Sequence, residues 1–390
     1  MNESVLIRSL QEFDAFVPEW RQFLQQHADH ATVFQDPALV RLEIESGQAG
    51  ELLIIGVRRD GKLRCVAPFH VVTETFPLRL GVVRLAGFRA RVLRLFGDRV
   101  ISAATGDVEG DLDQVFGRLA ALGGEFDLCA VSSVPCDGPL WRYFGGGQRR
   151  RCGFSLRRTT FKGAIVRQLR LQGSFEDYLQ TMKRKTRYNL NRSVKKFIEA
   201  TGGTARFSTI SEPGQVASFL RDLDRVYARS WQARTFGYQP RHTPREEARL
   251  LEAARHGWLR SYLLACEQGP VAFVLGFQYD GVYDYHEIGF DSDWRAHSPG
   301  NVLNMYLLED LFARDRPQVL DFGFGENDYK RIFGNHAFEA SNIYLLKPGI
   351  NRGSLLVRSQ YRLSRLYTAL HTLATRLGLD AWLRKVLKHR

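Results

Sequence analysis

Residues 280–330 of the 390-residue chain read DGVYDYHEIGFDSDWRAHSPGNVLNMYLLEDLFARDRPQVLDFGFGENDYK. The Asp-Gly pair that opens this stretch separates two apolar runs, Val271–Tyr279 and Val282–Phe290, and such a pair readily adopts the positive φ values of a tight hairpin turn. Downstream, apolar residues recur at helical spacing over 302–312 and predict an amphipathic helix. The order is therefore strand, short polar turn and helix N-terminus.

The turn at Arg295–Gly300 favours anion binding. Backbone N–H groups at a helix start lack intrahelical acceptors and lie at the positive end of the helix dipole, an arrangement that binds diphosphates. Gly300 lets a ligand approach the backbone, Ser298 is a candidate cap, and Arg295 adds a charge. An ordinary strand-to-helix loop with a surface arginine is the alternative interpretation.

The turn sequence Arg295-Ala296-His297-Ser298-Pro299-Gly300 resembles the pyrophosphate loop of the GNAT superfamily of acyl-CoA N-acyltransferases. It is most similar to the Arg-x-x-Ser-Pro-Gly form of a bacterial branch of cellulose-biosynthesis-type acetyltransferases, which are related to Fem-type peptidoglycan aminoacyl transferases. That branch also carries Asp-Phe-Gly-x-Gly-Glu followed by Tyr-Lys, matched by Asp321–Glu326 and Tyr329-Lys330. The resemblance covers roughly Leu171–Lys347. Pro299 departs from the general GNAT loop and removes one backbone donor.

The resemblance implies an α/β (α+β) fold of tandem GNAT-like domains, each a mixed, largely antiparallel twisted sheet flanked by helices. It implies acetyl-CoA or another acyl-CoA as donor, no metal, and direct attack of an amine on a thioester carbonyl polarised by a backbone N–H of the preceding strand. The residues expected to bind the donor are Ile288, Gly289, Phe290, Arg295, Ala296, His297, Ser298, Pro299, Gly300 and Asn301.

The expected catalytic groups lie near the ends of two strands. Tyr329 is the candidate acid, because its hydroxyl lies beyond the second strand, where a GNAT-like fold places the pantetheine sulfur. The candidate bases are His286, Glu287, Asp321 and Glu326. Lys330 and Trp231 are expected to contact the acceptor.

Each candidate has a structural alternative. His286 and Glu287 alternate along a strand, so one should face the core or cleft and the other should face outward. Asp321 is also a candidate turn cap, and Tyr329 with Phe333 has the i, i+4 spacing of a core pair. A metal site at Asp284, His286 and Asp291 lacks a matching ligand spacing. A dinucleotide fingerprint at 323–325 lacks its third glycine.

The chain length predicts two domains. The resemblance implies that these are a degenerate N-terminal GNAT-like domain (1–160) and a C-terminal GNAT acyltransferase domain (161–349), and the basic, leucine-containing end of the chain predicts an amphipathic helical tail (350–390). The first half has a hairpin signal at Asp60-Gly61 but no Arg-x-x-Ser-Pro-Gly sequence. We expect it to shape the acceptor groove. The low-apolar stretch Gly145–Arg151 is the best linker candidate, with a boundary near Lys162 as the alternative.

Cysteine usage predicts a reducing cytoplasm, since the five cysteines form no Cys-x-x-Cys pair and indicate neither a zinc site nor a disulfide framework. The N-terminal sequence lacks the apolar core of an export signal. No run approaches the roughly 20 apolar residues that a bilayer-spanning helix needs.

The net charge of +13 is concentrated in two places. From Ser341 onward there are ten Lys/Arg and one Asp, interleaved with leucines at helical spacing, which indicates either a helix docked on the body or an anchor on anionic lipid at the inner membrane surface. A second basic helix is predicted within 174–200. Its outer face is either solvated or contacts the 3′-phosphate end of CoA, an acidic polymer or tRNA.

These observations favour a cytoplasmic acyl-CoA-dependent N-acyltransferase that acts on an amine-bearing small molecule, sugar, polysaccharide precursor or other envelope component. Two alternatives stay open. One is a Fem-type transferase that uses aminoacyl-tRNA, and the other is a non-catalytic scaffold of an exopolysaccharide complex held at the membrane by its basic tail.

Overall fold

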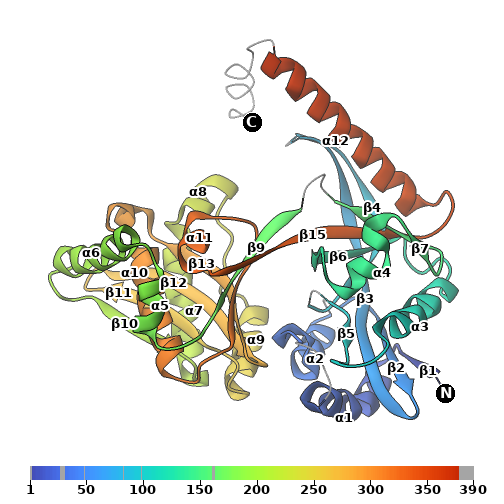
Figure 1. Cartoon of the computed structure of the whole chain (residues 1–390), viewed down its shortest axis with the longest axis horizontal. Coiled ribbons are helices and arrows are strands. Elements are labelled where there is room, and N and C mark those ends of the chain that lie inside the picture. The colour runs from blue at the N-terminus through green and yellow to red at the C-terminus, as the bar shows by residue number, and fades with distance from the viewer. Residues whose placement is uncertain are drawn as a thin grey trace. The chain divides into compact units, whose positions relative to one another are not determined.

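The computed structural model describes residues 2–26, 31–47, 49–81, 83–97, 99–159 and 163–376 (Figure 1). The chain forms two compact, discontinuous units. Unit 1 contains Met1–Glu19, Ala49–Phe161 and Ser341–Arg390, and unit 2 contains Trp20–Gln48 and Lys162–Ala340. The sequence predicted domains made of consecutive segments instead. The difference arises because strand β15 (His336–Leu346) pairs with a strand of unit 2 through its first half and with a strand of unit 1 through its second half.

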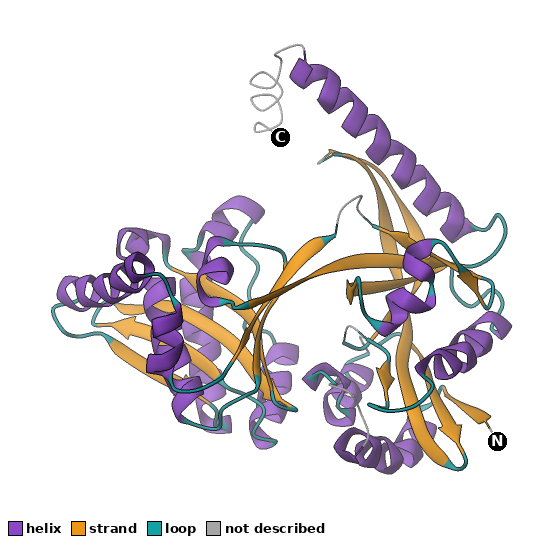
Figure 2. Cartoon of the chain, in the orientation of Figure 1, coloured by secondary structure: helices purple, strands orange, loops and turns teal. Residues whose placement is uncertain are grey.

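Unit 2 is a mixed sheet covered by helices on both faces (Figure 2). Its strands are β9 (Ala164–Arg170), β10 (Arg206–Ile210), β11 (Ser261–Cys266), β12 (Gly269–Tyr279), β13 (Val282–Phe290), β14 (Val319–Phe324) and the first half of β15. Its helices are α2 (Pro37–Glu45), α5 (Phe175–Thr181), α6 (Arg184–Ala200), α7 (Pro213–Ala228), α8 (Trp231–Phe236), α9 (Pro244–Arg255), α10 (Pro299–Ala313) and α11 (Asp328–Phe333), with 3₁₀ turns η1 (Val33–Gln35) and η3 (Ser292–His297).

Alternation along the strands of unit 2 builds two apolar layers. Tyr262 and Leu264 of β11 face α5, α6 and α10, whereas Leu263 between them faces α2, α7 and α9. Both layers are almost fully buried. Since successive side chains of a strand point to opposite faces, a strand that is apolar throughout must lie between two layers of helices.

The two central strands of unit 2 separate partway along their length. β13 and β14 pair in parallel at Val282–Asp284 and Val319–Asp321, and their pairing ends there. Beyond this point β13 continues alongside β12, while Phe324 of β14 pairs with β9. The separation leaves one edge of the second half of β13 without a neighbouring strand among the described residues.

Unit 1 repeats the strand order of unit 2. Its strands are β1 (Asn2–Ile7), β2 (Glu51–Arg59), β3 (Lys62–Leu80), β4 (Val83–Leu95), β5 (Ile101–Ser102), β6 (Leu128–Pro135), β7 (Arg150–Arg151) and β8 (Phe154–Arg158). Its helices are α3 (Val108–Ala121), α4 (Pro139–Tyr143) and α12 (Arg352–Arg376), with the 3₁₀ turn η2 (Gly145–Gly147). Helix α1 (Leu10–Gln26) begins in unit 1 and ends in unit 2. Strands β1 to β4 form an antiparallel series, and β6 is parallel to β4 after α3. Strands β10 to β13, α10 and β14 are arranged in the same way.

The predicted linker Gly145–Arg151 lies inside unit 1, where Gly145–Gly147 forms η2 and Arg150–Arg151 forms β7. The division falls instead at Phe161/Lys162, within the undescribed residues 160–162. The three glycines have positive φ, so their permissive backbone makes a tight turn in place of an extended linker.

Helix α12 docks on unit 1 through one face. Leu356 and Val357 are buried against a layer that includes Phe76 and Leu346, and the Gln360 amide bonds both backbone groups of Arg79 in β3. The predicted helix break at Gly378 and the basic residues that follow it lie outside the described residues. Of the helices described up to residue 376, none combines the length and the apolarity that crossing a membrane requires.

Candidate functional site

The site starts at the N-terminus of α10, which follows the end of β13 through the 3₁₀ turn η3. Ser298 adopts a left-handed conformation (φ 51°, ψ 49°) and Pro299 occupies the first helical position. The first intrahelical bond runs from Val302 N to Ser298 O at 3.1 Å, so the amides of Gly300 and Asn301 precede it and have no intrahelical acceptor. Ser298 was predicted to cap the helix, but its side chain makes no cap bond; its backbone conformation forms the turn instead.

A cavity of about 410 Å³ opens directly in front of this helix end. Residues of β13, η3, α10 and α11 contribute to its lining. The exposed guanidinium of Arg295 is in the lining and has no acidic partner among the described residues. A Cβ added to Gly300 would meet only Phe290, at 3.9 Å, so the backbone is open to the cavity at this residue.

The unpaired edge of β13 presents backbone groups at this cavity. Asp291 N donates to Val271 O at 2.8 Å, which makes this a hydrogen-bonded pair of the antiparallel ladder with β12. The backbone N–H and C=O groups of residues 287 and 289 therefore point toward β12, whereas those of Ile288 and Phe290 point away from it. In agreement, the Ile288 carbonyl accepts a hydrogen bond from Gln232 Nε2 at 3.3 Å.

The Asp-Phe-Gly-x-Gly segment after β14 forms a turn held by its own side chains. Gly323 and Gly325 have positive φ. Asp321 accepts hydrogen bonds from Gly323 N (2.7 Å) and Gln168 Nε2 (2.9 Å). Lys330 is 4% exposed, and its Nζ donates to Gly323 O (3.0 Å) and Phe324 O (3.2 Å). Burial lowers the pKa of this lysine, which the nearby Asp321 opposes.

This turn positions Tyr329 in the cavity lining. The Tyr329 ring packs against Tyr285 and Phe322, with 5.9 Å between centroids in both pairs. Burial raises the pKa of its hydroxyl, so Tyr329 stays protonated at neutral and mildly alkaline pH. A second polar pair in the lining joins Tyr285 to Asn304, which lies one helical turn after Gly300: the tyrosine hydroxyl donates to Asn304 Oδ1 at 2.5 Å.

His286 and Glu287 do not alternate as predicted. A β-bulge shifts the register between β12 and β13, because Leu275 pairs with Glu287 while Phe277 pairs with Asp284. The extra residue turns both side chains to the face covered by α7. The His286 ring contacts Phe34 and Phe277, and Glu287 Oε1 lies 3.0 Å from Arg241 Nε. A carboxylate and an imidazole are thus adjacent on the face opposite the Tyr285–Asn304 pair.

We expect Glu287 to give the protein a characteristic pH dependence. Its burial raises the pKa above the ordinary 4.5, and the Arg241 charge opposes this effect only in part. A carboxyl with a raised folded-state pKa destabilises the folded state as it ionises, so stability falls as pH rises from about 4.5 through the folded pKa. Urea denaturation of wild type and Glu287→Gln across pH 4–8 checks this. The difference in unfolding free energy, wild type minus variant, should decrease with pH; a flat or rising difference contradicts it.

The cavity contains eight of the ten predicted donor-binding residues and one of the five predicted catalytic residues. Ala296 and His297 are outside its lining. Glu326 forms an ion pair with Arg167 (2.6 Å), and Asp321 and Lys330 hold the turn described above. Trp231, half exposed at the start of α8, also lies outside the lining. No group of three His, Cys, Asp or Glu side chains suited to a metal occurs in the described part of the chain.

Sequence reasoning missed Tyr285, Asn304 and Asp328, which all line the cavity. Asn304 carried a usable signal, because it is a polar residue on the apolar stripe of α10, four residues after Gly300. Tyr285 carried a weaker one, since it neighbours His286 in a strand with many aromatic residues.

Known proteins resemble the chain in sequence over one segment and in fold over most of its length. Residues 184–331 match the family described as acetyltransferase (GNAT) domain, so this segment is similar to a GNAT acetyltransferase domain. The crystal structure of FemX is similar at a TM-score of 0.57 and 11% identity, over 88% of this chain and 97% of that chain. A conserved protein of unknown function from Bacteroides thetaiotaomicron VPI-5482 is similar at 0.50 and 11%, over 89% and 100%. At these identities the similarity concerns the fold alone. No curated protein matches the chain.

Proposed function

We propose that the chain is an acyl-CoA-dependent N-acyltransferase, with acetyl-CoA as its simplest donor. The observation that carries this proposal is the cavity between the free edge of β13 and the open N-terminus of α10. It combines a site for a diphosphate at Gly300 and Asn301 with backbone donors at Ile288 and Phe290 farther along the same wall. GNAT-type similarity over 184–331 supports the same chemistry.

The residues at the helix start fit the diphosphate of CoA. Two amides without an intrahelical acceptor at the positive end of a 15-residue helix, and the Arg295 guanidinium, which has no acidic partner in the described ranges, supply three donor groups. The first turn of α10 contains no acidic residue. The corresponding helix start in unit 1 has the opposite character: Asp107 caps α3 with its own side chain, and Glu109 and Asp111 lie in the first turn. Anions are repelled there, which supports unit 2 as the donor-binding unit and unit 1 as a degenerate copy.

In the proposed reaction, a neutral amine attacks the carbonyl carbon of the thioester. The Ile288 amide stabilises the negative charge that develops on the carbonyl oxygen. The C–N bond forms, the C–S bond breaks, and the departing sulfur takes a proton from the Tyr329 hydroxyl. The attacking nitrogen loses a proton to Glu287 or His286, which lie together on the other face of β13. Thus donor and acceptor approach the strand from opposite faces.

The acceptor is an amine on a sugar, polysaccharide precursor or other envelope component. This part of the proposal rests on the Arg-x-x-Ser-Pro-Gly and Asp-Phe-Gly-x-Gly-Glu sequences, which resemble the cellulose-biosynthesis-type branch. The exposed basic face of α6 is a candidate contact for the 3′-phosphate of CoA. It is also the feature that keeps the aminoacyl-tRNA alternative open.

Acetyl-CoA is expected to raise the unfolding temperature of the wild-type chain, and Arg295→Glu to remove most of this increase. Reversing the charge replaces an attraction to the diphosphate with a repulsion, and loss of a charge-assisted contact costs about 1.5–3 kcal/mol, equivalent to at least tenfold in affinity. Differential scanning fluorimetry with acetyl-CoA, CoA and deacylated tRNA is the measurement.

Arg234→Glu is a suitable control, because this exposed arginine of α8 pairs with the exposed Asp293 at 3.2 Å and does not line the cavity. A wild-type chain that tRNA stabilises but acetyl-CoA does not would contradict the proposal and favour the Fem-type alternative. A chain stabilised by neither would favour a scaffold.

A further inference from the structure

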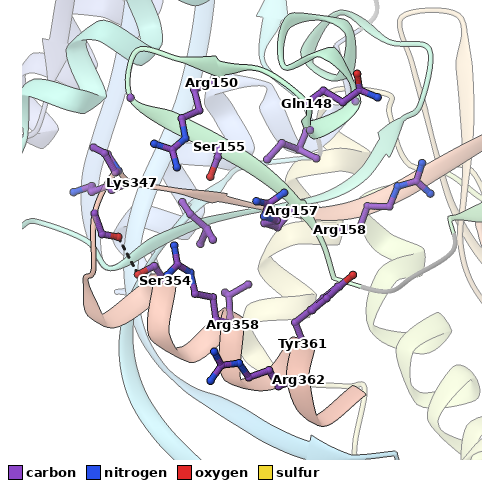
Figure 3. A pocket seen from close by; sticks show the side chains of 18 of the residues that line it. Gln148, Arg150, Ser155, Arg157, Arg158, Lys347, Ser354, Arg358, Tyr361 and Arg362 are labelled. Carbon is purple, nitrogen blue, oxygen red and sulfur yellow. Dashed lines mark hydrogen bonds between the residues drawn. The ribbon is translucent and has the colours of Figure 1, made fainter. Parts of the chain in front are cut away.

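A second cavity, of about 680 Å³, lies entirely within unit 1 and is lined by cations (Figure 3). We call it the arginine pocket. Its arginines are Arg150, Arg157, Arg158, Arg358, Arg362 and Arg365, and Lys347 completes the charged lining. The first three come from β7 and β8, and the last three from one face of α12. The described lining contains no Asp or Glu.

Most of these cations have no counter-charge within the part of the chain that the structure describes. Arg158 stacks on Trp141 at 4.6 Å, and the Lys347 ammonium bonds the Gly123 carbonyl and covers the Phe126 ring. The other five arginines have no acidic partner among the described residues. Like charges gathered without counter-ions repel one another and destabilise a fold. An anionic ligand that neutralises them removes this cost, so the arrangement indicates a binding site for phosphate groups.

The surface beside the arginine pocket is apolar. Leu366, Leu370 and Leu373 of α12 are each about half exposed, and at 3.6 residues per turn their stripe lies about 80° around the helix from the arginine stripe. The buried face of α12, with Leu356 and Val357, points the other way, into unit 1. The helix is therefore docked on the protein and still presents adjoining cationic and leucine-rich surfaces to solvent. Helices that lie in a membrane interface have this pattern.

We propose that unit 1 binds the surface of an anionic membrane, with lipid phosphates in the arginine pocket and the leucine stripe at the boundary of the acyl chains. A soluble phosphate compound would use the arginines but not the leucines. Single-stranded nucleic acid would favour stacked aromatic platforms, and Tyr361 is the pocket's one aromatic lining residue among those described. Lipid is the partner that accounts for both surfaces. The proposal is independent of the acyltransferase site.

The test is co-sedimentation of the full chain with phosphatidylcholine vesicles that contain or lack phosphatidylglycerol. Wild type should sediment only with the anionic vesicles. R358Q/R362Q/R365Q should weaken this binding on the order of 100-fold, because each basic residue near an anionic surface contributes roughly a factor of five. These side chains are exposed and have no acidic partner in the described part of the chain, so the variant should fold, which its unfolding temperature checks.

A matched control removes the same charge elsewhere. R184Q/R192Q/K196Q changes three exposed cations of α6 and should leave vesicle binding close to wild type. L366S/L370S/L373S should lower vesicle binding while leaving stabilisation by inorganic pyrophosphate unchanged, whereas the arginine variant should lose both.

Three outcomes overturn the proposal. In the first, both triple charge variants lose vesicle binding equally, which would mean that net charge alone is responsible. In the second, pyrophosphate stabilises the wild type through these arginines but the protein does not bind anionic vesicles, which would identify the ligand of the arginine pocket as a soluble phosphate compound. In the third, the wild type binds tRNA through the same arginines but does not bind anionic vesicles, which would identify the ligand of the arginine pocket as a nucleic acid.

Discussion

Gly300→Val is expected to abolish the stabilisation by acetyl-CoA while the protein remains folded. The new Cβ meets only Phe290, at 3.9 Å, so the folded state has room for it. Its methyl groups would, however, lie over the amides of Gly300 and Asn301 and keep a diphosphate away. Loss of two charge-assisted backbone bonds, at about 1.5–3 kcal/mol each, weakens binding roughly 100-fold or more. Isothermal titration with acetyl-CoA and fluorimetry at fixed ligand concentration measure this.

Gly214→Val provides a closely matched control. Gly214 follows Pro213 at the start of α7 and occupies the same helical position that Gly300 occupies after Pro299 in α10. A Cβ there meets nothing within 4 Å. The control should bind acetyl-CoA like wild type. If Gly300→Val also binds normally, the diphosphate is not held at the start of α10 and the donor site must be sought elsewhere.

Local backbone chemistry explains which parts of the fold were predictable. The hairpins at Asp60-Gly61 and Asp280-Gly281 were predicted from residue type, and all four residues have positive φ. The strand Val282–Phe290 was predicted with its observed ends. The sequence Thr243-Pro244-Arg245-Glu246 is typical of a helix N-terminus, and the Thr243 side chain accepts a hydrogen bond from the Glu246 amide at 3.2 Å. The turns and the cap are each set by two to four consecutive residues, and the strand is a continuous run that starts directly after its turn, so a single sequence suffices to detect them.

The features that were not predicted depend on residues distant in the chain. The bulge that turns His286 and Glu287 to one face is a mismatch between two strands, and neither strand reveals it alone. Lys330 was predicted to contact the acceptor because it belongs to a recognisable sequence pattern. In the structure Lys330 stabilises the glycine turn, since its ammonium donates hydrogen bonds to the carbonyls of Gly323 and Phe324. One predicted helix over 174–200 is two helices, because Met182 adopts an extended conformation between α5 and α6.

The glycine turn links the second sequence pattern to the proposed chemistry. Asp321 and Lys330 bind the turn from its two ends, and α11 starts immediately after it. This arrangement fixes the position of the Tyr329 hydroxyl, because Tyr329 lies in α11 and its ring packs against Tyr285 and Phe322. Most residues of the pattern therefore act by fixing the position of one side chain in the cavity lining.

Tyr329→Phe is expected to reduce kcat by roughly 10²–10⁴-fold, the usual contribution of a general acid, with KM for acetyl-CoA nearly unchanged. Phenylalanine keeps the ring contacts with Tyr285 and Phe322, so the fold and the donor cavity should persist. The hydroxyl is the only group removed. The measurement is amine-dependent release of free CoA thiol over a panel of amino sugars and small amines, together with an acetyl-CoA titration.

Tyr188→Phe is the control, since this tyrosine of α6 is 62% exposed and lies outside the cavity lining. The split between kcat and KM separates the roles that Tyr329 can have. Burial keeps its hydroxyl protonated, which a proton donor to the departing sulfur requires. A variant with wild-type kcat would mean that the thiolate leaves without this proton. A variant that loses acetyl-CoA binding and keeps kcat at saturation would make Tyr329 a positioning residue for the donor.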